Sequence, residues 1–148
     1  KCSPNLELSF DDIKNFEQEY GQIPSGAFVA FRSGWDQYWG NKERYRNPDS
    51  RGIMHFPCYS VEAASALIER GVIGIGIDTL SPDPSQGDFP VHRRVLGAGK
   101  YILENLASLD QVPPVGAEII VLPLKIDGGA ESAVRAVALI PFGGRNNP

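Results

Sequence analysis

Apolar residues near the start of the chain recur with the period of an α-helix. In the segment LSFDDIKNFEQEYG, Phe10 and Phe16 belong to an apolar stripe at helical spacing, and acidic residues occupy the first turn. Ser9 has the side chain of an N-cap, and Gly21 stands where the helix should end. The pattern predicts a short amphipathic helix over residues 10–20.

A second helix is predicted in the segment SVEAASALIERG. Ser60 is its candidate N-cap, Glu62 lies in the first turn, and small and branched apolar residues occupy one face before Gly71. We expect this helix over residues 61–70. The apolar run VIGIGI begins almost at once after it, and such a short helix-to-strand connection is typical of α/β proteins.

Apolar runs of strand length accompany these helices. They lie at residues 27–32, 72–77, 101–106, 117–126 and 133–140. The second run places Asp78 at its carboxyl end, and the proline-rich segment that follows can only be a loop. The segment VHRRVLGAGK has room for two helical turns. Helices and strands in this mixed order predict an α/β fold.

Size and charge exclude several classes of protein. The chain has 148 residues, 42% of them hydrophobic, which suffices for one globular domain and is too little for two. Its net charge of -4 argues against a nucleic-acid partner, because phosphate binding needs clustered Lys and Arg. No apolar run in the sequence approaches the roughly 20 residues that span a bilayer, so we expect no membrane partner.

A histidine and a glutamate lie on either side of a glycine-rich break in FPVHRRVLGAGKYILENL. If residues 92–104 formed one helix, His92 and Glu104 would lie about 18 Å apart on different faces. In an extended chain the two would be separated by as much as about 40 Å. Only a chain reversal near Gly97 and Gly99 would bring them together, and glycines favour such reversals.

The residues alone leave two interpretations of this pair open. A carboxylate in the apolar run YILENL needs a cation or a metal as partner, unless it faces solvent from an edge strand. Glu104 could pair with Arg93 or Arg94 instead, and His92 could be an ordinary surface residue.

The number of candidate ligands limits the kind of metal site that the chain could form. A catalytic zinc site usually takes three protein ligands and a water molecule. Beyond His92 and Glu104, the other candidate ligands near the loop are one imidazole and three carboxylates: His55, Asp78, Asp83 and Asp88. The sequence therefore supplies half of a metal site more readily than a whole one.

Three motifs, in this order, resemble those of the metal-dependent cyclase family, which includes bacterial kynurenine formamidase and isatin hydrolase. GAFVAFRSGWDQYW resembles the family's strand that ends in Arg-(Ser/Thr)-Gly-Trp, and GIDTLSPD its Gly-(Ile/Val)-Asp-Thr-x-Ser-x-Asp turn. VLPLKIDGGAESAVRAVAL resembles its closing strands. The resemblance covers nearly the whole chain and implies an α/β fold, a swivelling mixed β-sheet domain with flanking helices.

The resemblance also implies roles for individual residues. His92 and Glu104 fall on positions that bind a divalent metal, usually zinc or manganese, in the family. Asp78 and Ser81 are expected to line or buttress the site, although a purely structural role in the turn is an equal alternative. Trp35 is expected to wall the substrate pocket or, alternatively, to be an aromatic core residue.

One departure from the family pattern concerns the remaining ligands. The family's His-x-x-x-His-x-Asp segment, with a nearby acid/base histidine, has no counterpart in this sequence. We therefore expect residues 1–148 to form a single domain that is the C-terminal portion of a hydrolase, with the N-terminal half absent from this chain. That half would be a separate polypeptide, and no catalytic residue is assigned within this chain.

The activity implied by the resemblance is metal-dependent hydrolysis of an amide C–N bond. The small-molecule substrate would be an aryl formamide or a small cyclic amide, cleaved only when the missing half is present. The alternative is a non-catalytic binding or assembly module that keeps the fold without a complete metal site. The family also implies a homo-oligomer, expected to be a dimer, and a cytoplasmic location.

Overall fold

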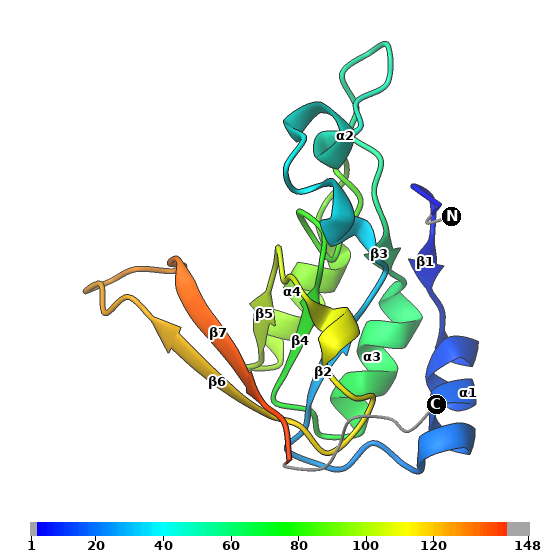
Figure 1. Ribbon diagram of the computed structural model, residues 1–148, viewed down its shortest axis with the longest axis vertical. Coiled ribbons are helices and arrows are strands. Elements are labelled where there is room, and N and C mark those ends of the chain that lie inside the picture. The colour runs from blue at the N-terminus through cyan, green and yellow to red at the C-terminus, as the bar shows by residue number, and fades with distance from the viewer. Residues whose placement is uncertain (1–2, 142–148) are drawn as a thin grey trace. The chain divides into compact units, whose positions relative to one another are not determined.

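A parallel three-stranded sheet is the centre of the unit formed by Lys1–Leu109. Its strands lie in the order β2 (Phe28–Phe31), β4 (Gly74–Ile77) and β5 (Tyr101–Leu103) (Figure 1). All three run in the same direction, so their carboxyl ends share one edge of the sheet. The predicted strands at 27–32, 72–77 and 101–106 are thereby confirmed, each somewhat shorter than expected.

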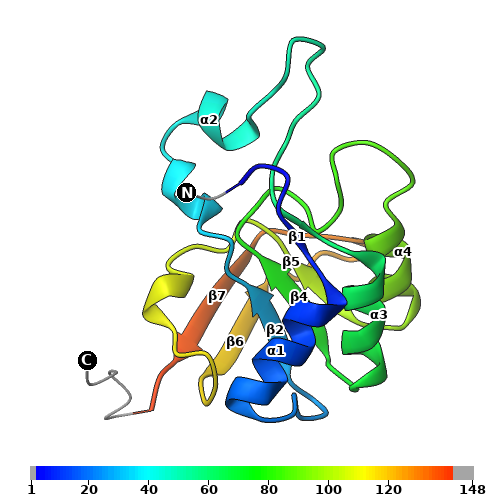
Figure 2. The same ribbon diagram turned by 90° about the vertical axis from the view of Figure 1, so that its right-hand side faces the viewer.

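The computed structural model describes residues 3–141. In it, helices α3 (Val61–Glu69) and α4 (Pro90–Gly97) pack beside one another in the first unit (Figures 1 and 2). Alternate side chains of β4 pack into the same core cluster as residues of both helices, since Ile75 and Ile77 are fully buried there. This cluster is the main hydrophobic core.

Glycines occupy the alternate positions of β4 because bulky side chains cross its other face. The rings of Phe28 and Tyr101 stack with centroids 5.6 Å apart, one ring from each neighbouring strand. A Cβ at Gly76 would lie 2.5 Å from the Phe28 ring, and one at Gly74 would lie 2.9 Å from the Tyr101 ring. The GIGI sequence therefore suits a strand with helices on one side and flat rings on the other.

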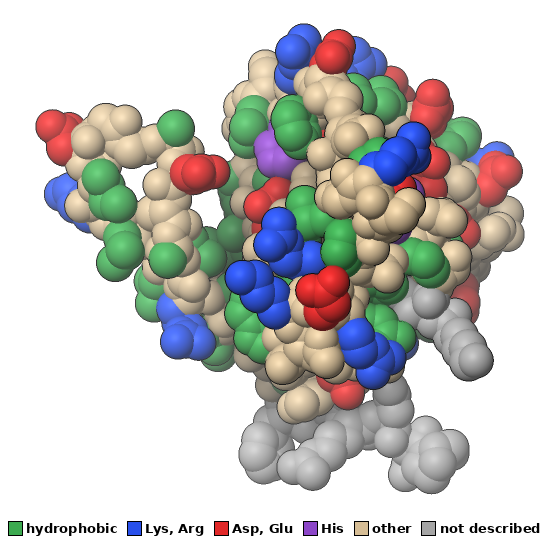
Figure 3. Space-filling model, turned by 90° about the horizontal axis from the view of Figure 1, so that it is seen from above, with side chains coloured by type: hydrophobic (Ala, Val, Ile, Leu, Met, Phe, Trp, Pro, Cys, Tyr) green, Lys and Arg blue, Asp and Glu red, His purple; other side chains and the backbone are tan. Residues whose placement is uncertain are grey.

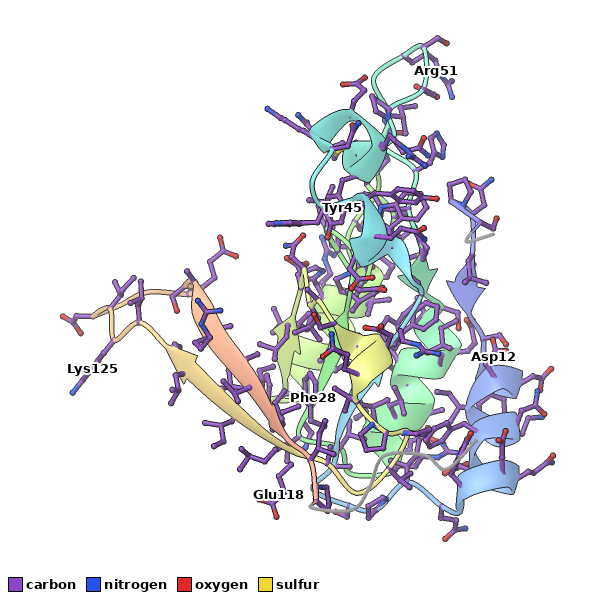
Figure 4. The ribbon with its side chains drawn as sticks, viewed as in Figure 1. Asp12, Phe28, Tyr45, Arg51, Glu118 and Lys125 are labelled. Atoms are coloured by element: carbon purple, nitrogen blue, oxygen red, sulfur yellow. The ribbon has the colours of Figure 1, made fainter. Side chains whose placement is uncertain are left out.

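Helix α1 (Phe10–Tyr20) has the bounds that the sequence predicts. The Ser9 hydroxyl accepts a hydrogen bond from the backbone N–H of Asp12, and the Asp12 carboxylate accepts one from the backbone N–H of Ser9. This reciprocal capping box fixes the first turn. Asp12 lies at that end of the helix in Figure 4.

An ion pair joins α1 to the end of α3. Two nitrogens of the Arg70 guanidinium donate to the two carboxylate oxygens of Glu17, at 2.6 and 2.5 Å. The backbone N–H of Ile23 donates to the same carboxylate at 3.2 Å. The hydrogen bond from Arg70 is the main reason why the pKa of Glu17 lies below its ordinary value.

We expect Glu17→Gln to lower the free energy of unfolding by about 1–2 kcal/mol at pH 7, since a two-pronged, charge-assisted pair is lost. Because folding lowers the pKa of Glu17, its stabilisation is present above the ordinary value of 4.5 and fades as the pH falls through the folded pKa. Urea unfolding from pH 7 to pH 3 should show the two proteins converge at low pH. Glu69→Gln, at an exposed neighbour of Arg70, is the matched control; a pH-independent difference for Glu17→Gln would contradict the account.

Short elements between the main strands were not predicted individually. Strands β1 (Glu7–Leu8) and β3 (Cys58–Tyr59) pair in parallel, and each is too short to show a period. The segment after β2 contains a 3-10 helix, η1 (Trp35–Tyr38), and the short helix α2 (Lys42–Arg46), followed by a loop with Arg51 near its tip (Figure 4).

The second unit, Asp110–Pro148, contains an antiparallel hairpin. Strands β6 (Glu118–Pro123) and β7 (Val134–Leu139) pair along their full length, as predicted for the two last apolar runs. Glu118 lies at the open end of this hairpin and Lys125 in its connecting loop (Figure 4). A 3-10 turn, η2 (Leu109–Gln111), lies at the junction of the two units in sequence.

The predicted α/β class is confirmed, with a parallel sheet in one unit and an antiparallel hairpin in the other. That residues 1–148 form a single domain stays a prediction. Within residues 3–141, every helix falls short of the length and apolarity that a transmembrane span requires.

Candidate metal site

The candidate site lies where strands of the parallel sheet end. Asp78 directly follows β4 and Glu104 directly follows β5. Ser33 comes two residues after the end of β2, the third strand of the sheet. Carboxyl ends of parallel strands are where open α/β sheets most often bind ligands. Figure 3 is seen from above, and on that face a histidine side chain lies beside hydrophobic and acidic ones.

His92 and Glu104 lie together in the structure. The Nε2 atom of His92 is 3.3 Å from the Oε1 atom of Glu104, and each side chain keeps about a third of its surface exposed. Helix α4 ends at Gly97, Gly99 has a φ of +70°, and β5 then runs back along the sheet. The chain reversal that the sequence required at these glycines is confirmed.

A buried aspartate fixes the orientation of the histidine. The Asp83 carboxylate lies 2.7 Å from Nδ1 of His92 and accepts hydrogen bonds from the backbone N–H groups of Val91 and His92, at 2.7 and 2.9 Å. These two N–H groups belong to the first turn of α4, whose N-cap residue Phe89 offers no side-chain acceptor. Asp83 therefore has two roles: it caps α4, and it holds the imidazole of His92 in position.

This contact sets the tautomer of His92. A carboxylate only accepts hydrogen bonds, so Nδ1 must carry a proton to bond with Asp83. In the neutral imidazole, Nε2 is then left with its lone pair directed to the side where Glu104 lies. A histidine that ligates a metal commonly has this arrangement, with its other ring nitrogen bound to a carboxylate.

The ring of Phe89 lies edge-on to the imidazole, with centroids 5.9 Å apart. Phe89 has a left-handed backbone (φ 53°), which is uncommon for a residue other than glycine, and is 47% exposed. Sequence reasoning missed both Asp83 as the orienting group and Phe89. One sequence feature could have indicated Asp83. The run Ser-Pro-Asp precedes a helix that begins with proline and whose N-cap residue has no side-chain acceptor, so the helix needs an acceptor from elsewhere.

Asp78 is fully buried and serves as a multiple acceptor. Its carboxylate accepts hydrogen bonds from the hydroxyl and the N–H of Ser33, at 2.6 and 3.1 Å, and from the N–H groups of Gly34 and Trp35, at 2.7 and 3.1 Å. These bonds hold the turn after β2, where Gly34 adopts a φ of +80°. This geometry suits both a buttress of the site and the purely structural role in the turn that was considered for Asp78. Its lining of a substrate pocket stays a prediction.

Trp35 belongs to a small aromatic core with Tyr45 and Phe56. Only 3% of Trp35 is exposed, and its indole N–H donates to the carbonyl of Tyr45 at 2.8 Å. The structure thus gives Trp35 a packing role within the first unit. Its role as a wall of the substrate pocket stays a prediction.

Tyr45 lies in α2 (Figure 4), and its hydroxyl contacts residues at the ends of β4 and β5. It lies 3.1 Å from the carbonyl oxygen of Asp78 and 2.9 Å from the amide oxygen of Asn105, the residue after Glu104. Burial, helped by the charge of Asp78, raises the pKa of Tyr45 well above its usual range. The hydroxyl therefore stays protonated and acts as a donor.

Ser81 shapes the turn that carries Asp83. Its hydroxyl accepts a hydrogen bond from the N–H of Asp83 at 3.1 Å, and its carbonyl accepts one from the Thr79 hydroxyl at 3.1 Å. The half-buried Ser81 therefore acts on His92 indirectly, through Asp83. Contact between Ser81 and a substrate stays a prediction.

The pair of His92 and Glu104 fits two positions of a divalent metal. Two ligands bound at about 2.0–2.1 Å to a tetrahedral zinc ion lie roughly 3.3–3.4 Å from each other. The observed separation is 3.3 Å. An imidazole nitrogen and a carboxylate oxygen also form a donor set that zinc accepts, and manganese favours the carboxylate.

Other candidate ligands do not join this pair in the described part of the chain. Among residues 3–141, no three His, Cys, Asp or Glu side chains form a group that could hold a metal ion. The imidazole of His55 lies 3.5 Å from the Asp49 carboxylate, and Asp88 is exposed in the loop before α4. The described residues thus bring together two ligands and the carboxylate that orients one of them.

We expect Asp83→Asn to weaken zinc or manganese binding by about 10- to 100-fold, the usual loss when a histidine ligand loses its carboxylate partner. The amide can still accept one hydrogen bond from the helix, so much of the fold should survive. Metal titration by calorimetry checks the effect, with the exposed Asp88→Asn as the matched control. Equal affinities for Asp83→Asn and the unaltered protein would show that Asp83 only caps the helix.

Comparison with protein families supports the motif analysis. Residues 1–84, more than half of the chain, match the profile of the Cyclase family. An isatin hydrolase of Roseibium aggregatum is 34% identical over 145 residues, which are 95% of this chain and 55% of that protein. A kynurenine formamidase of Paracidovorax citrulli is 37% identical over 97 residues, 65% of this chain and 44% of that protein. The chain spans about half the length of the curated relatives it matches.

Solved structures agree with this assignment. A crystal structure of an isatin hydrolase bound to the product analogue thioisatinate matches with a TM-score of 0.88 and 34% identity, over 93% of this chain and 54% of that one. The structure of a predicted metal-dependent hydrolase from Bacillus stearothermophilus also matches. Its TM-score is 0.67 and its identity 26%, over 89% of this chain and 56% of that one.

Proposed function

The chain belongs to the Cyclase family, and we propose that it provides part of the metal site of a hydrolase that cleaves an amide C–N bond. The observation that carries this proposal is the pairing of His92 and Glu104 at 3.3 Å, with the imidazole oriented by Asp83. The named activities of the relatives favour an aryl formamide or a small cyclic amide as substrate.

The residues of this chain would perform three tasks in that reaction. Nε2 of His92 and the carboxylate of Glu104 would hold zinc or manganese, while Asp83 keeps a proton on Nδ1 so that Nε2 stays a ligand. A bound divalent ion supplies polarisation of the amide carbonyl and a lower pKa for a coordinated water. Asp78 keeps the end of β2 in place beside the site through its four accepted hydrogen bonds.

The remaining ligands and the proton shuttle would come from outside this chain. The sequence lacks a His-x-x-x-His-x-Asp segment, and two protein ligands rarely hold zinc tightly. We propose that a separate polypeptide equivalent to the family's N-terminal half supplies them. We propose further that the two-part protein forms a homo-oligomer and is located in the cytoplasm.

A non-catalytic module is the second candidate. The absence of a third metal ligand from the group at His92, within residues 3–141, favours it. A binding or assembly module of this kind would keep the sheet and the turn at Asp78 and would hydrolyse nothing.

Hydrolysis assays separate the two candidates. The protein, purified with any polypeptide that accompanies it, is tested on formanilide and on isatin after treatment with chelator and after addition of zinc or manganese. The proposal expects hydrolysis that disappears with the chelator and returns with metal. A complete two-part preparation, verified by intact mass, that neither binds metal nor cleaves either compound would establish the non-catalytic module instead.

A further inference from the structure

The loop that follows Glu104 has an unusual backbone. Asn105 and Ser108 have φ angles of 56° and 59°, in the left-handed region that residues other than glycine seldom adopt. Asparagine tolerates this region better than most residues, because its short polar side chain can bond locally. Two such residues within four positions indicate that the surrounding structure fixes this loop.

Two contacts from the segment 35–46 fix the loop at both of these residues. The amide oxygen of Asn105 accepts a hydrogen bond from the Tyr45 hydroxyl at 2.9 Å, and the N–H of Ser108 donates to the Asp36 carboxylate at 2.9 Å. Tyr45 is itself only 4% exposed and packs with Trp35, so its hydroxyl is held in position. The loop is therefore anchored to a part of the chain 60 or more residues away.

The backbone on either side of Asn105 is anchored to β4 as well. The N–H of Asn105 donates to the carbonyl of Thr79 at 2.9 Å, and the N–H of Leu106 donates to the carbonyl of Ile77 at 3.0 Å. Glu104 lies between this anchored turn and the buried end of β5 at Leu103. The direction of the Glu104 side chain therefore depends on the conformation of Asn105.

We propose that Tyr45 and Asn105 are a pair of positioning residues that hold the Glu104 carboxylate opposite His92. This inference rests on the proposed metal site. His92 is oriented through its hydrogen bond with Asp83, and Glu104 is oriented through its neighbour Asn105. The two ligands are thus positioned by two independent sets of contacts, one from the loop before α4 and one from α2.

Metal affinity tests the pair directly. Tyr45→Phe removes the donor and keeps the buried ring, and Asn105→Gly removes the acceptor in a residue that adopts positive φ freely. Each variant is expected to weaken zinc binding to the protein by about 10-fold, and the double variant by little more than either single one. Tyr38→Phe is the matched control, since the Tyr38 ring packs against the same cluster and its hydroxyl bonds to no residue among those described.

The outcomes distinguish this inference from the proposed function. Loss of thermal stability with unchanged zinc affinity in Tyr45→Phe and Asn105→Gly would overturn the positioning role and leave the metal site intact. Additive losses in the double variant would also overturn the pair, because the two residues would then act separately. Failure of the complete two-part preparation, with this chain unaltered, to bind zinc or manganese would overturn the proposed function and this inference together.

Discussion

His92→Ala is expected to abolish retention of zinc or manganese and, with it, any amide hydrolysis. The substitution removes the ligand atom Nε2 that faces Glu104 and leaves Asp83 without its imidazole partner. Loss of an orienting group alone lowers metal affinity by about 10- to 100-fold, so loss of the ligand should exceed about 100-fold. Metal content after dialysis, measured by elemental mass spectrometry, checks the effect.

The other histidine of the chain provides the matched control. His55 lies in the loop after α2, with its side chain 40% exposed and its ring 3.5 Å from the Asp49 carboxylate. His55→Ala should leave metal content unchanged. Equal metal content in His92→Ala and the unaltered protein, or a selective loss in His55→Ala, would place the metal elsewhere.

Asp78→Ala is expected to lower the free energy of unfolding by about 3–5 kcal/mol, which is much of the usual stability of a domain. The alanine takes the acceptor at the fully buried position 78 away from the N–H groups of Ser33 and Gly34 and leaves the N–H of Trp35 with the Ser33 hydroxyl alone, at 3.3 Å. Each buried donor that loses its partner costs about 1–3 kcal/mol. Urea unfolding monitored by tryptophan fluorescence measures the change.

Two further variants keep this prediction testable. Asp78→Asn preserves the shape and should cost less than Asp78→Ala, so it provides a folded comparison if the alanine variant does not fold. Asp88→Ala removes an exposed carboxylate from the nearby loop and should change stability by at most about 0.5 kcal/mol. Equal stabilities of Asp78→Ala and Asp88→Ala would contradict the role of Asp78 as the acceptor that holds the turn.

Elements with their own capping residues were predictable from the sequence. Helices α1 and α3 have their N-caps at Ser9 and Ser60 and alternate apolar and polar faces, so local physics determines their starts. Strands β1 and β3 contain two residues each and exist only because they pair with one another across 51 positions. No local pattern can reveal such a pairing.

In the candidate site, too, some features could be predicted from the sequence and others could not. A reversal at the glycines made an approach of His92 to Glu104 possible, and the resemblance to the cyclase family implied that the two residues meet. The role of Asp83 depends on the path of an irregular loop, and the contact of Tyr45 with Asn105 joins residues 60 positions apart. For Trp35, the sequence left a core role and a pocket role open, and only the packing around it shows its burial.

Locating the metal in crystals of the metal-loaded protein tests the central claim most directly. Anomalous scattering recorded at the zinc or manganese absorption edge identifies the ion without ambiguity. The account predicts a peak within bonding distance, about 2.0–2.2 Å for zinc, of both Nε2 of His92 and the Glu104 carboxylate. A peak elsewhere in the molecule, with His92 and Glu104 still in contact with each other at about their present 3.3 Å, would contradict it.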